Sequence, residues 1–380
     1  MVDGFQNRVL ILAGEPSGDM HASSLVEAIH DVNPNIEFSG IAGDKMISSG
    51  VKPLYHLKNM AFLGVIEVIK HLPFILKVEK EIIEYIKLNK IKLAILIDYQ
   101  DFNLRFAKKL KNHGVKIVYY ISPQIWAWHQ SRIKKIKNRV DKMLVVFPFE
   151  EKFYIDGNVP VNYVGHPLVE RISNYEFKSK TDFLNENNIE KEILLILPGS
   201  RKDEIKKHLA ELIKTSEIIS KKNNLQTVVA CADNFDEEYL REYINSENVK
   251  VIKGSTYNLL KHSKFGIIKS GTSTLEAAII GMPFVVIYST SKLTYEIGKR
   301  LVKLDSIAMP NIIAGKKIVR EFIQEDVNAK LIAEYVQTIL DDDSQEDLIK
   351  NELNNVKIKL GSKGASENAA KIILSMLDET

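Results

Sequence analysis

Cysteine is nearly absent from this chain of 380 residues. The single cysteine, Cys231, lies in a mostly apolar run. No disulfide can therefore form within the chain, and no cluster of cysteines can bind a metal ion. A small buried hydrophobe is the usual role of such a residue. We expect a protein of a reducing, cytoplasmic compartment.

A strong excess of one charge is also lacking, because 52 Lys and Arg residues face 49 Asp and Glu residues. A nucleic-acid-binding surface normally needs a larger basic excess, so nucleic acid is not an expected partner. No apolar stretch approaches the roughly 20 residues that span a bilayer. The apolar run Val9–Ala13 is too short for the core of a signal peptide. A soluble globular protein is expected.

Short apolar runs alternate with helical patterns, and this alternation occurs twice. In the first half, strands are predicted at Val9–Ala13, Leu93–Ile97, Val115–Tyr120 and Lys142–Val146, with helices at Ala22–Val32 and Phe102–His113. In the second half, strands are predicted at Ile193–Leu197, Thr227–Cys231, Val249–Ile252, Phe265–Ile268 and Phe284–Ile287, with a helix at Asp203–Ser220. Continuous apolar strands between helices are typical of parallel sheets covered on both faces. The sequence therefore predicts an α/β protein with two doubly wound halves.

The chain is longer than one hydrophobic core usually spans, so two domains are expected. The polar segment 174–191 has the composition of a linker. We place the first domain at 1–173, the second at 174–345 and a C-terminal helical tail at 346–380. This tail would pack back on the first domain or onto a partner chain, as in a homodimer.

Two polar turns of the first half directly follow predicted strands. Gly14–Asp19 follows the first strand, and Asp98 follows the strand that ends at Ile97. Because the carboxyl ends of parallel strands line the crevice where such sheets bind ligands, Asp98 could act as a general base. Capping of the next helix is the alternative role for both Asp98 and Asp101. Spacing leaves the choice open; we assign the cap to Asp101 and the crevice to Asp98.

Aromatic, apolar and basic segments of the first half are candidates for lipid contact. Trp126 and Trp128 follow a strand and could line a pocket, although packing under a loop is the commoner role of tryptophan. Met60–Ile69 carries one charge and is either a buried helix or an exposed surface for acyl chains or membrane. A basic helix is predicted over Arg132–Lys142, with either a solvated face or a contact for anionic lipid.

Two turns of the second half have the chemistry of phosphate binding. Gly199–Arg201 follows a strand and enters a helix, so it offers backbone N–H groups and a guanidinium. Ser270–Thr272 begins another helix, whose N-terminal dipole attracts anions. Glu276, one turn later, could accept hydrogen bonds from a ribose. A surface arginine and a plain capping cluster are the alternatives, but two such turns in one half favour a diphosphate ligand.

Taken together, the motifs resemble those of the lipid-A-disaccharide synthase family. They are GEPSGD (14–19), IDYQDFN (97–103), SPQIWAWH (122–129), GHPL (165–168), LPGSR (197–201), SGTSTLE (270–276) and MPNIIAG (309–315). The resemblance implies a GT-B fold, with two Rossmann-like domains facing a cleft, and an inverting glycosyl transfer without metal or cofactor. The implied donor is UDP-2,3-diacylglucosamine, and the acceptor is the 6-hydroxyl of 2,3-diacylglucosamine 1-phosphate, or lipid X. The products would be the β(1→6) disaccharide 1-phosphate and UDP, formed at the cytoplasmic face of the anionic inner membrane.

The same resemblance implies roles for individual residues. Asp98 matches the catalytic base, and Glu15 is the second candidate. The implied donor-binding residues are Gly199, Ser200, Arg201, Ser270, Gly271, Thr272, Ser273, Glu276, Asn311 and Gln324. Contact with the lipid acceptor is expected from Gly18, Met60, Phe62, Val65, Ile69, Ser122, Trp126 and Trp128. Gln100 and His129 depart from the family pattern, which usually has proline and arginine there, but neither is assigned to chemistry.

Two other readings of the motifs remain. One is a different GT-B enzyme, either a UDP-N-acetylglucosamine 2-epimerase or the peptidoglycan glucosaminyltransferase. The epimerase would have no need of the apolar segment Met60–Ile69. The other is a non-catalytic protein that binds nucleotide sugars, which would have no need of a carboxylate such as Asp98 in the cleft.

Overall fold

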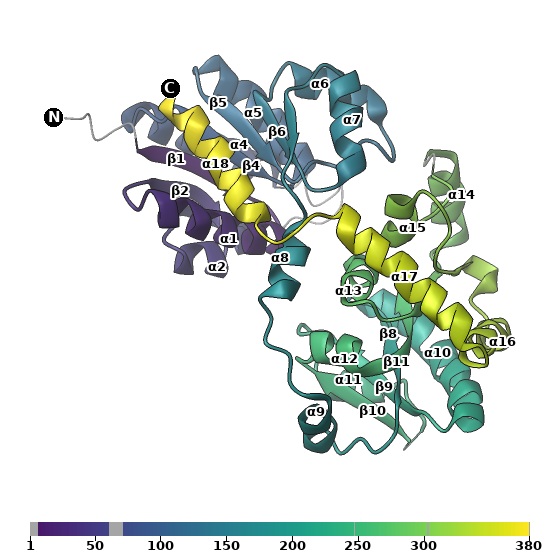
Figure 1. The fold of residues 1–380 in the computed structure, drawn as a ribbon. Helices are drawn as coiled ribbons and strands as arrows, with labels where there is room; N and C mark the ends of the chain where they lie inside the picture. The colour runs from purple at the N-terminus through teal and green to yellow at the C-terminus, as the bar shows by residue number, and fades with distance from the viewer. Residues whose placement is uncertain (1–6, 61–70, 247, 302–303, 380) are drawn as a thin grey trace. The chain divides into compact units, whose positions relative to one another are not determined.

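The computed structural model describes residues 7–60, 71–246, 248–301 and 304–379. The chain divides into two compact units (Figure 1). The first unit consists of Met1–Glu170 and Ser362–Thr380, and the second of Arg171–Gly361. Among the described residues, no helix has the length and apolar character that crossing a membrane requires.

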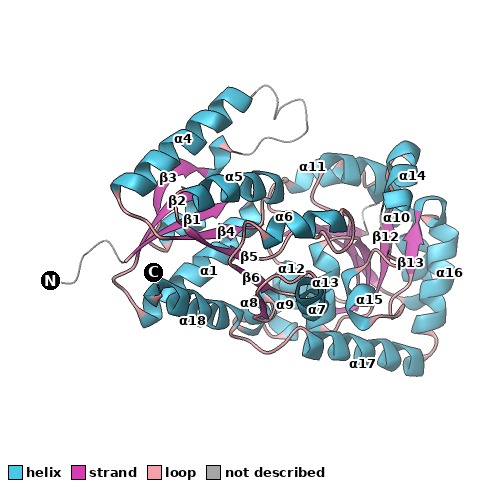
Figure 2. Cartoon of the chain, turned by 90° about the horizontal axis from the view of Figure 1, so that it is seen from above, coloured by secondary structure: helices cyan, strands magenta, loops and turns pink. Residues whose placement is uncertain are grey.

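A parallel sheet of seven strands forms the centre of the first unit, in the order β3-β2-β1-β4-β5-β6-β7. The strands are β1 (Arg8–Ala13), β2 (Glu37–Ala42), β3 (Lys52–His56), β4 (Leu93–Ile97), β5 (Lys116–Tyr120), β6 (Lys142–Val145) and β7 (Val161–Tyr163). The helices are α1 (Pro16–Val32), α2 (Asp44–Ser48), α4 (Leu72–Leu88), α5 (Gln100–Asn112), α6 (Ile133–Lys137), α7 (Pro148–Asp156), α8 (Pro167–Ser173) and α18 (Ala365–Asp378), with 3-10 turns at Leu57–Asn59 and Gln130–Arg132. Every residue of β4 is buried, as expected for a strand covered on both faces. Figure 2 shows α4 and α5 on one face of the sheet, and α1 and α18 on the other.

The second unit has a parallel sheet of six strands, in the order β10-β9-β8-β11-β12-β13. The strands are β8 (Ile193–Leu197), β9 (Gln226–Cys231), β10 (Val249–Lys253), β11 (Ser263–Lys269), β12 (Phe284–Tyr288) and β13 (Glu321–Ile323). The helices are α9 (Lys180–Glu186), α10 (Lys202–Asn223), α11 (Glu237–Arg241), α12 (Thr256–His262), α13 (Thr272–Ile280), α14 (Lys292–Leu301), α15 (Met309–Ala314), α16 (Ala329–Leu340) and α17 (Asp343–Lys359), with a 3-10 turn at Gln324–Asp326. Cys231 is buried, as expected for a small hydrophobe.

Each sheet has a point at which the order of its strands reverses. The chain moves outward from β1 to β2 and β3, and then returns to place β4 on the other side of β1. In the same way, β11 pairs with β8 after the chain has formed β9 and β10. Connections leave such neighbouring strands toward opposite faces of the sheet, which opens a crevice at their carboxyl ends. The turns after β1, β4, β8 and β11 are therefore the expected places for ligands.

The strands predicted from the sequence are present, but four others were not predicted. Three of these, β3, β7 and β13, lie at the edges of the sheets and are only partly buried, so they lack a continuous apolar run. In the fourth, β2, the small residues Ser39 and Gly40 interrupt the apolar run of the sequence.

Two helical predictions require correction. The basic helix predicted over Arg132–Lys142 is much shorter, because α6 ends at Lys137 and Lys142 already belongs to β6. The expected tail of 346–380 is divided, since 346–361 belong to the second unit. In the first unit, α18 packs against α1. Its Asn368 Nδ2 also donates to the carbonyl of Val164, just after β7, at 3.1 Å.

Candidate functional site

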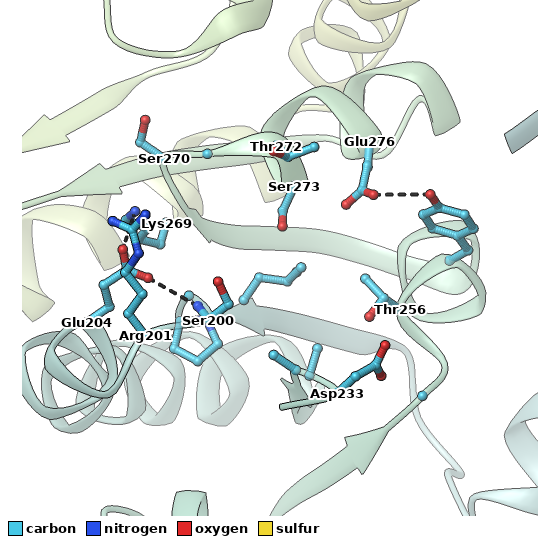
Figure 3. Close-up of a pocket in the computed structure, with 18 of the residues that line it drawn as sticks. Ser200, Arg201, Glu204, Asp233, Thr256, Lys269, Ser270, Thr272, Ser273 and Glu276 are labelled. Carbon is cyan, nitrogen blue, oxygen red and sulfur yellow. Dashed lines mark hydrogen bonds and ion pairs between the residues drawn. The ribbon is translucent and has the colours of Figure 1, made fainter. Parts of the chain in front are cut away.

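A pocket in the second unit lies at the carboxyl ends of β8 and β11 (Figure 3). Eight of the ten predicted donor-binding residues line it. They are Gly199, Ser200, Arg201, Ser270, Gly271, Thr272, Ser273 and Glu276. The structure thus brings the turn after β8 and the turn after β11 into one site, as two adjacent parallel strands require.

The turn after β8 depends on glycine. Gly199 has a φ of 114°, in the left-handed region that side chains disfavour. A Cβ at this position would also lie 2.3 Å from Oε2 of Glu204. Ser200 follows, and its backbone N–H donates to the same Oε2 at 3.1 Å. Arg201 is then the N-cap residue of α10, and it lines the pocket.

Lys269 and Glu204 are pocket residues that the sequence analysis did not assign. Lys269 ends β11, and its Nζ lies 2.6 Å from Oε1 of Glu204. Burial alone would raise the pKa of Glu204, but the bond to Lys269 holds this pKa below its usual range. The signal available in the sequence was the position of Lys269 directly before the SGTSTLE turn.

Glu276 lies on α13, at the opposite side of the pocket from Glu204 in Figure 3. Its Oε1 accepts a hydrogen bond from the Tyr257 hydroxyl at 3.1 Å, and burial raises its pKa. The Arg171 guanidinium lies 5.3 Å from the centre of the Tyr257 ring. This side of the pocket therefore combines an aromatic ring with a carboxylate acceptor, groups that suit a nucleoside.

The other two predicted donor-binding residues do not line the pocket. Asn311 is 2% exposed, and its amide is used within the loop that follows α15. It donates to the Val319 carbonyl at 2.9 Å and accepts from the Ile318 N–H at 2.8 Å. Gln324 accepts from the Thr290 N–H at 2.7 Å and so holds the turn after β12. In the structure both residues organise loops of the second unit.

In the first unit, Asp98 and Glu15 lie at the carboxyl ends of the adjacent strands β4 and β1. Asp98 and Tyr99 have φ angles of 49° and 43°, so the chain turns sharply after β4. The Asp98 carbonyl accepts from the Tyr119 hydroxyl and from Asn103 Nδ2, the latter at 2.9 Å. These bonds stabilise an unusual backbone conformation at Asp98.

The electrostatics of this turn suit a proton acceptor. Burial raises the pKa of Asp98 to about 6, with a further contribution from the negative charge of Glu15. Glu15 itself is exposed at the start of α1. Gly14 is required next to them, because a Cβ there would lie 1.9 Å from the Tyr99 ring. Gly18 is buried on α1, but a Cβ there would make only ordinary contacts, at 3.6 Å or more, so the packing does not require glycine.

Asp101 does not cap α5, contrary to the prediction. The N-cap position belongs to Tyr99, and no side chain bonds there. Asp101 lies in the first turn with 80% of its side chain exposed, where it pairs with Arg132 at 3.0 Å. The reason is that α5 begins at Gln100, two residues before the predicted start at Phe102.

Asp19 has a structural role that the sequence analysis missed. Its buried carboxylate accepts from the backbone N–H groups of Gly43, Lys45 and Met46 at 2.8, 3.1 and 3.1 Å. It thereby caps α2 from another element and joins α1 to the turn after β2.

Some residues expected to contact the lipid acceptor are internal. Met60 is 0% exposed and belongs to the hydrophobic core, so it presents no apolar surface. Trp126 is also buried, and its Nε1 donates to Glu150 Oε1 at 3.0 Å. Ser122 donates to the same oxygen at 2.5 Å, and burial raises the pKa of Glu150 to about 7. Trp128 is half-buried; Phe62, Val65 and Ile69 lie outside the described residues.

The chain is similar to known proteins over most of its length. The family model for lipid-A-disaccharide synthetase matches residues 9–376. The chain is 38% identical to lipid-A-disaccharide synthase of Geobacter metallireducens over 373 residues, 97% of each chain. It is 39% identical to that of Nitrosococcus oceani over 381 residues, 97% of this chain and 96% of the relative.

Solved structures with the same fold have much lower identity. The S. aureus MnaA structure with UDP aligns with a TM-score of 0.69 at 14% identity, over 98% of both chains. The UDP-GlcNAc 2-epimerase of Neisseria meningitidis bound to UDP-GlcNAc gives 0.60 at 13%, over 98% of this chain and 100% of that one. These matches support the GT-B fold alone. With the family model covering nearly its whole length, the chain belongs to the lipid-A-disaccharide synthase family of glycosyltransferases.

Proposed function

We propose that this enzyme transfers 2,3-diacylglucosamine from UDP-2,3-diacylglucosamine to the 6-hydroxyl of lipid X, which releases UDP. Family membership supports formation of the lipid A disaccharide. The observation that carries the donor assignment is the pocket of the second unit, where Arg201, Lys269 and the start of α13 surround one space. A 2-epimerase or a peptidoglycan glucosaminyltransferase is not favoured by the family match.

Departure of UDP is the step that the donor pocket would assist. As the glycosidic bond breaks, negative charge develops on the diphosphate. A guanidinium, an ammonium and helix N-terminal N–H groups aimed at this charge stabilise the transition state. We propose that Arg201, Lys269 and Ser270–Thr272 supply this stabilisation without a metal ion, while Glu276 binds the ribose.

Asp98 is the proposed base. The acceptor hydroxyl loses its proton as its oxygen attacks the anomeric carbon from the face opposite UDP. With a pKa of about 6, Asp98 is ionised at neutral pH and yet more basic than an ordinary aspartate. Glu15, whose charge contributes to that basicity, is the second candidate.

We further propose that the enzyme attaches peripherally to the anionic cytoplasmic face of the inner membrane. Support comes from basic side chains around the end of α5 and on α6, which include the exposed Lys108, Lys134, Lys135 and Lys137. Lys134→Glu with Lys135→Glu should reduce sedimentation with anionic vesicles. Lys221→Glu with Lys222→Glu, an equal charge change on α10, should not. Equal loss in both double variants would contradict this attachment.

Activity on the two lipid substrates tests the proposed function. The purified protein, incubated with UDP-2,3-diacylglucosamine and lipid X, should form UDP and the disaccharide 1-phosphate in equal amounts. Omission of lipid X should stop UDP release. Turnover of UDP-N-acetylglucosamine to its 2-epimer, without any disaccharide from the lipid substrates, would show that the assignment is wrong.

A further inference from the structure

A carboxylate lies inside the pocket that should bind the donor diphosphate. Glu204 Oε1 pairs with Lys269 at 2.6 Å, and its Oε2 accepts from the Ser200 N–H at 3.1 Å. The side chains of Glu204 and Lys269 are only 15% and 16% exposed. Figure 3 shows this carboxylate between the turn after β8 and the turn after β11. A fixed negative charge here is unexpected, because a diphosphate would be repelled by it.

Helix capping explains one of these contacts but not the other. Glu204 lies in the first turn of α10, from which an acidic side chain often reaches back to a free backbone N–H. That role accounts for the bond to Ser200 and is served equally well by glutamine. It does not account for the bond to Lys269, the last residue of β11. Through this bond the carboxylate connects the turn after β8 with the end of β11.

The two groups that hold Glu204, the Ser200 N–H and the Lys269 ammonium, are groups that bind oxyanions. A backbone N–H offers one hydrogen, so a phosphate oxygen that bonds to Ser200 has to replace Glu204 there. The Lys269 ammonium faces the same space. We propose that Glu204 is a resident anion that occupies contacts of the donor diphosphate in the empty pocket and is exchanged for it on binding. This inference rests on the proposed function, since it requires that the pocket binds a UDP-sugar.

The exchange would affect the pocket both before the donor binds and when UDP is released. While the pocket is empty, Glu204 keeps Lys269 beside the turn at 199–201 and prevents it from moving into solvent. Once the donor is bound, the displaced carboxylate stays on the first turn of α10, close to the diphosphate. The resulting repulsion weakens the binding of UDP and favours its release after transfer.

Glu204→Gln tests this exchange, because glutamine keeps the reach-back bond to Ser200 while it removes the charge. UDP and uridine affinities of the full chain are measured by calorimetry for the wild type and the variant. We expect UDP to bind about tenfold more tightly to the variant, a difference of one decade in Kd. Uridine lacks phosphates, so its affinity should not change.

Glu346→Gln is the matched control. Glu346 is also buried in the second unit and pairs with Lys264 at 2.7 Å and Lys350 at 2.5 Å, but it does not line the pocket. Its replacement should leave UDP affinity unchanged. If Glu204→Gln does not melt cooperatively, Glu204→Met, which keeps the length without the charge, takes its place.

Three results would overturn the exchange. UDP affinity that is unchanged or weaker in the Glu204 variant would make Glu204 a residue that only positions Lys269. Equal tightening of UDP and uridine would indicate a general change of the pocket. Tightening in the Glu346 control as well would indicate a nonspecific charge effect. A wild type that binds no UDP would instead overturn the proposed donor pocket, and the exchange with it.

Discussion

The two crevices, one in each sheet, have the same topology and opposite chemistry. In the first unit, the turns after β1 and β4 carry the carboxylates Glu15 and Asp98. In the second, Arg201 in the turn after β8 and Lys269 at the end of β11 are cations. The fold therefore determines where a ligand binds, and a few turn residues determine what is bound. One crevice suits a hydroxyl that must lose a proton, and the other suits a diphosphate.

The turns also differ in how their backbone is stabilised. Gly199 takes a left-handed conformation at little cost, whereas Asp98 takes it as a residue with a side chain. The first unit compensates with hydrogen bonds from Tyr119 and Asn103 to the Asp98 carbonyl.

The largest effect should come from the crevice of the first unit, which carries Glu15 and Asp98 and is called the acidic crevice below. Asp98→Asn should lower kcat by about 10²- to 10⁴-fold, because the general base is lost. UDP affinity should stay unchanged, since Asp98 belongs to the first unit and the donor pocket to the second. Steady-state kinetics and UDP titration measure the two effects. Asp101→Asn is the control and should retain its rate; loss of kcat in Glu15→Gln alone would move the base to Glu15.

The next largest effect should come from the crevice of the second unit, which carries Arg201 and Lys269 and is called the cationic crevice below. Arg201→Ala should lower kcat/KM by about 10²- to 10³-fold, the usual result of removing one group that stabilises developing negative charge. Initial rates at low donor concentration measure it. Arg241→Ala removes an exposed arginine of the same unit that does not line the pocket. Similar rates for both variants would show that Arg201 is an ordinary surface residue.

A smaller effect, on stability, should separate two acids of one motif. Asp19→Ala should lower the free energy of unfolding by roughly 1.5–3 kcal/mol, because three backbone N–H groups, two of them buried, lose a charged acceptor. Glu15→Ala should change it little, since Glu15 is exposed and its side chain makes no capping bond. Urea unfolding of both variants provides the comparison, and equal destabilisation would refute it.

The smallest effect should come from metal removal. If cationic side chains and a helix N-terminus stabilise departing UDP, then EDTA should leave the initial rate unchanged. Loss of activity that magnesium or manganese restores would show that the cationic crevice does not act alone.

Much of the fold could be predicted because the buried strands are continuous apolar runs. The same strands located the turns, so Asp98 and Arg201 were placed at strand ends from the sequence. Contacts between distant segments could not be predicted. The pairing of Glu204 with Lys269 depends on β8 and β11 becoming neighbours, and the burial of Trp126 depends on Glu150 reaching it from α7. No local pattern contains that information.

The dependence of rate on pH tests the assignment of the base most directly. Only the ionised form of Asp98 can accept the proton, and its pKa is raised to about 6. The wild-type kcat/KM should therefore be constant above this pH and fall tenfold per unit below it. Glu15→Gln should move the midpoint to lower pH, because Glu15 contributes to raising the pKa. A midpoint near 4 in the wild type, or one that persists in Asp98→Asn, would contradict the account.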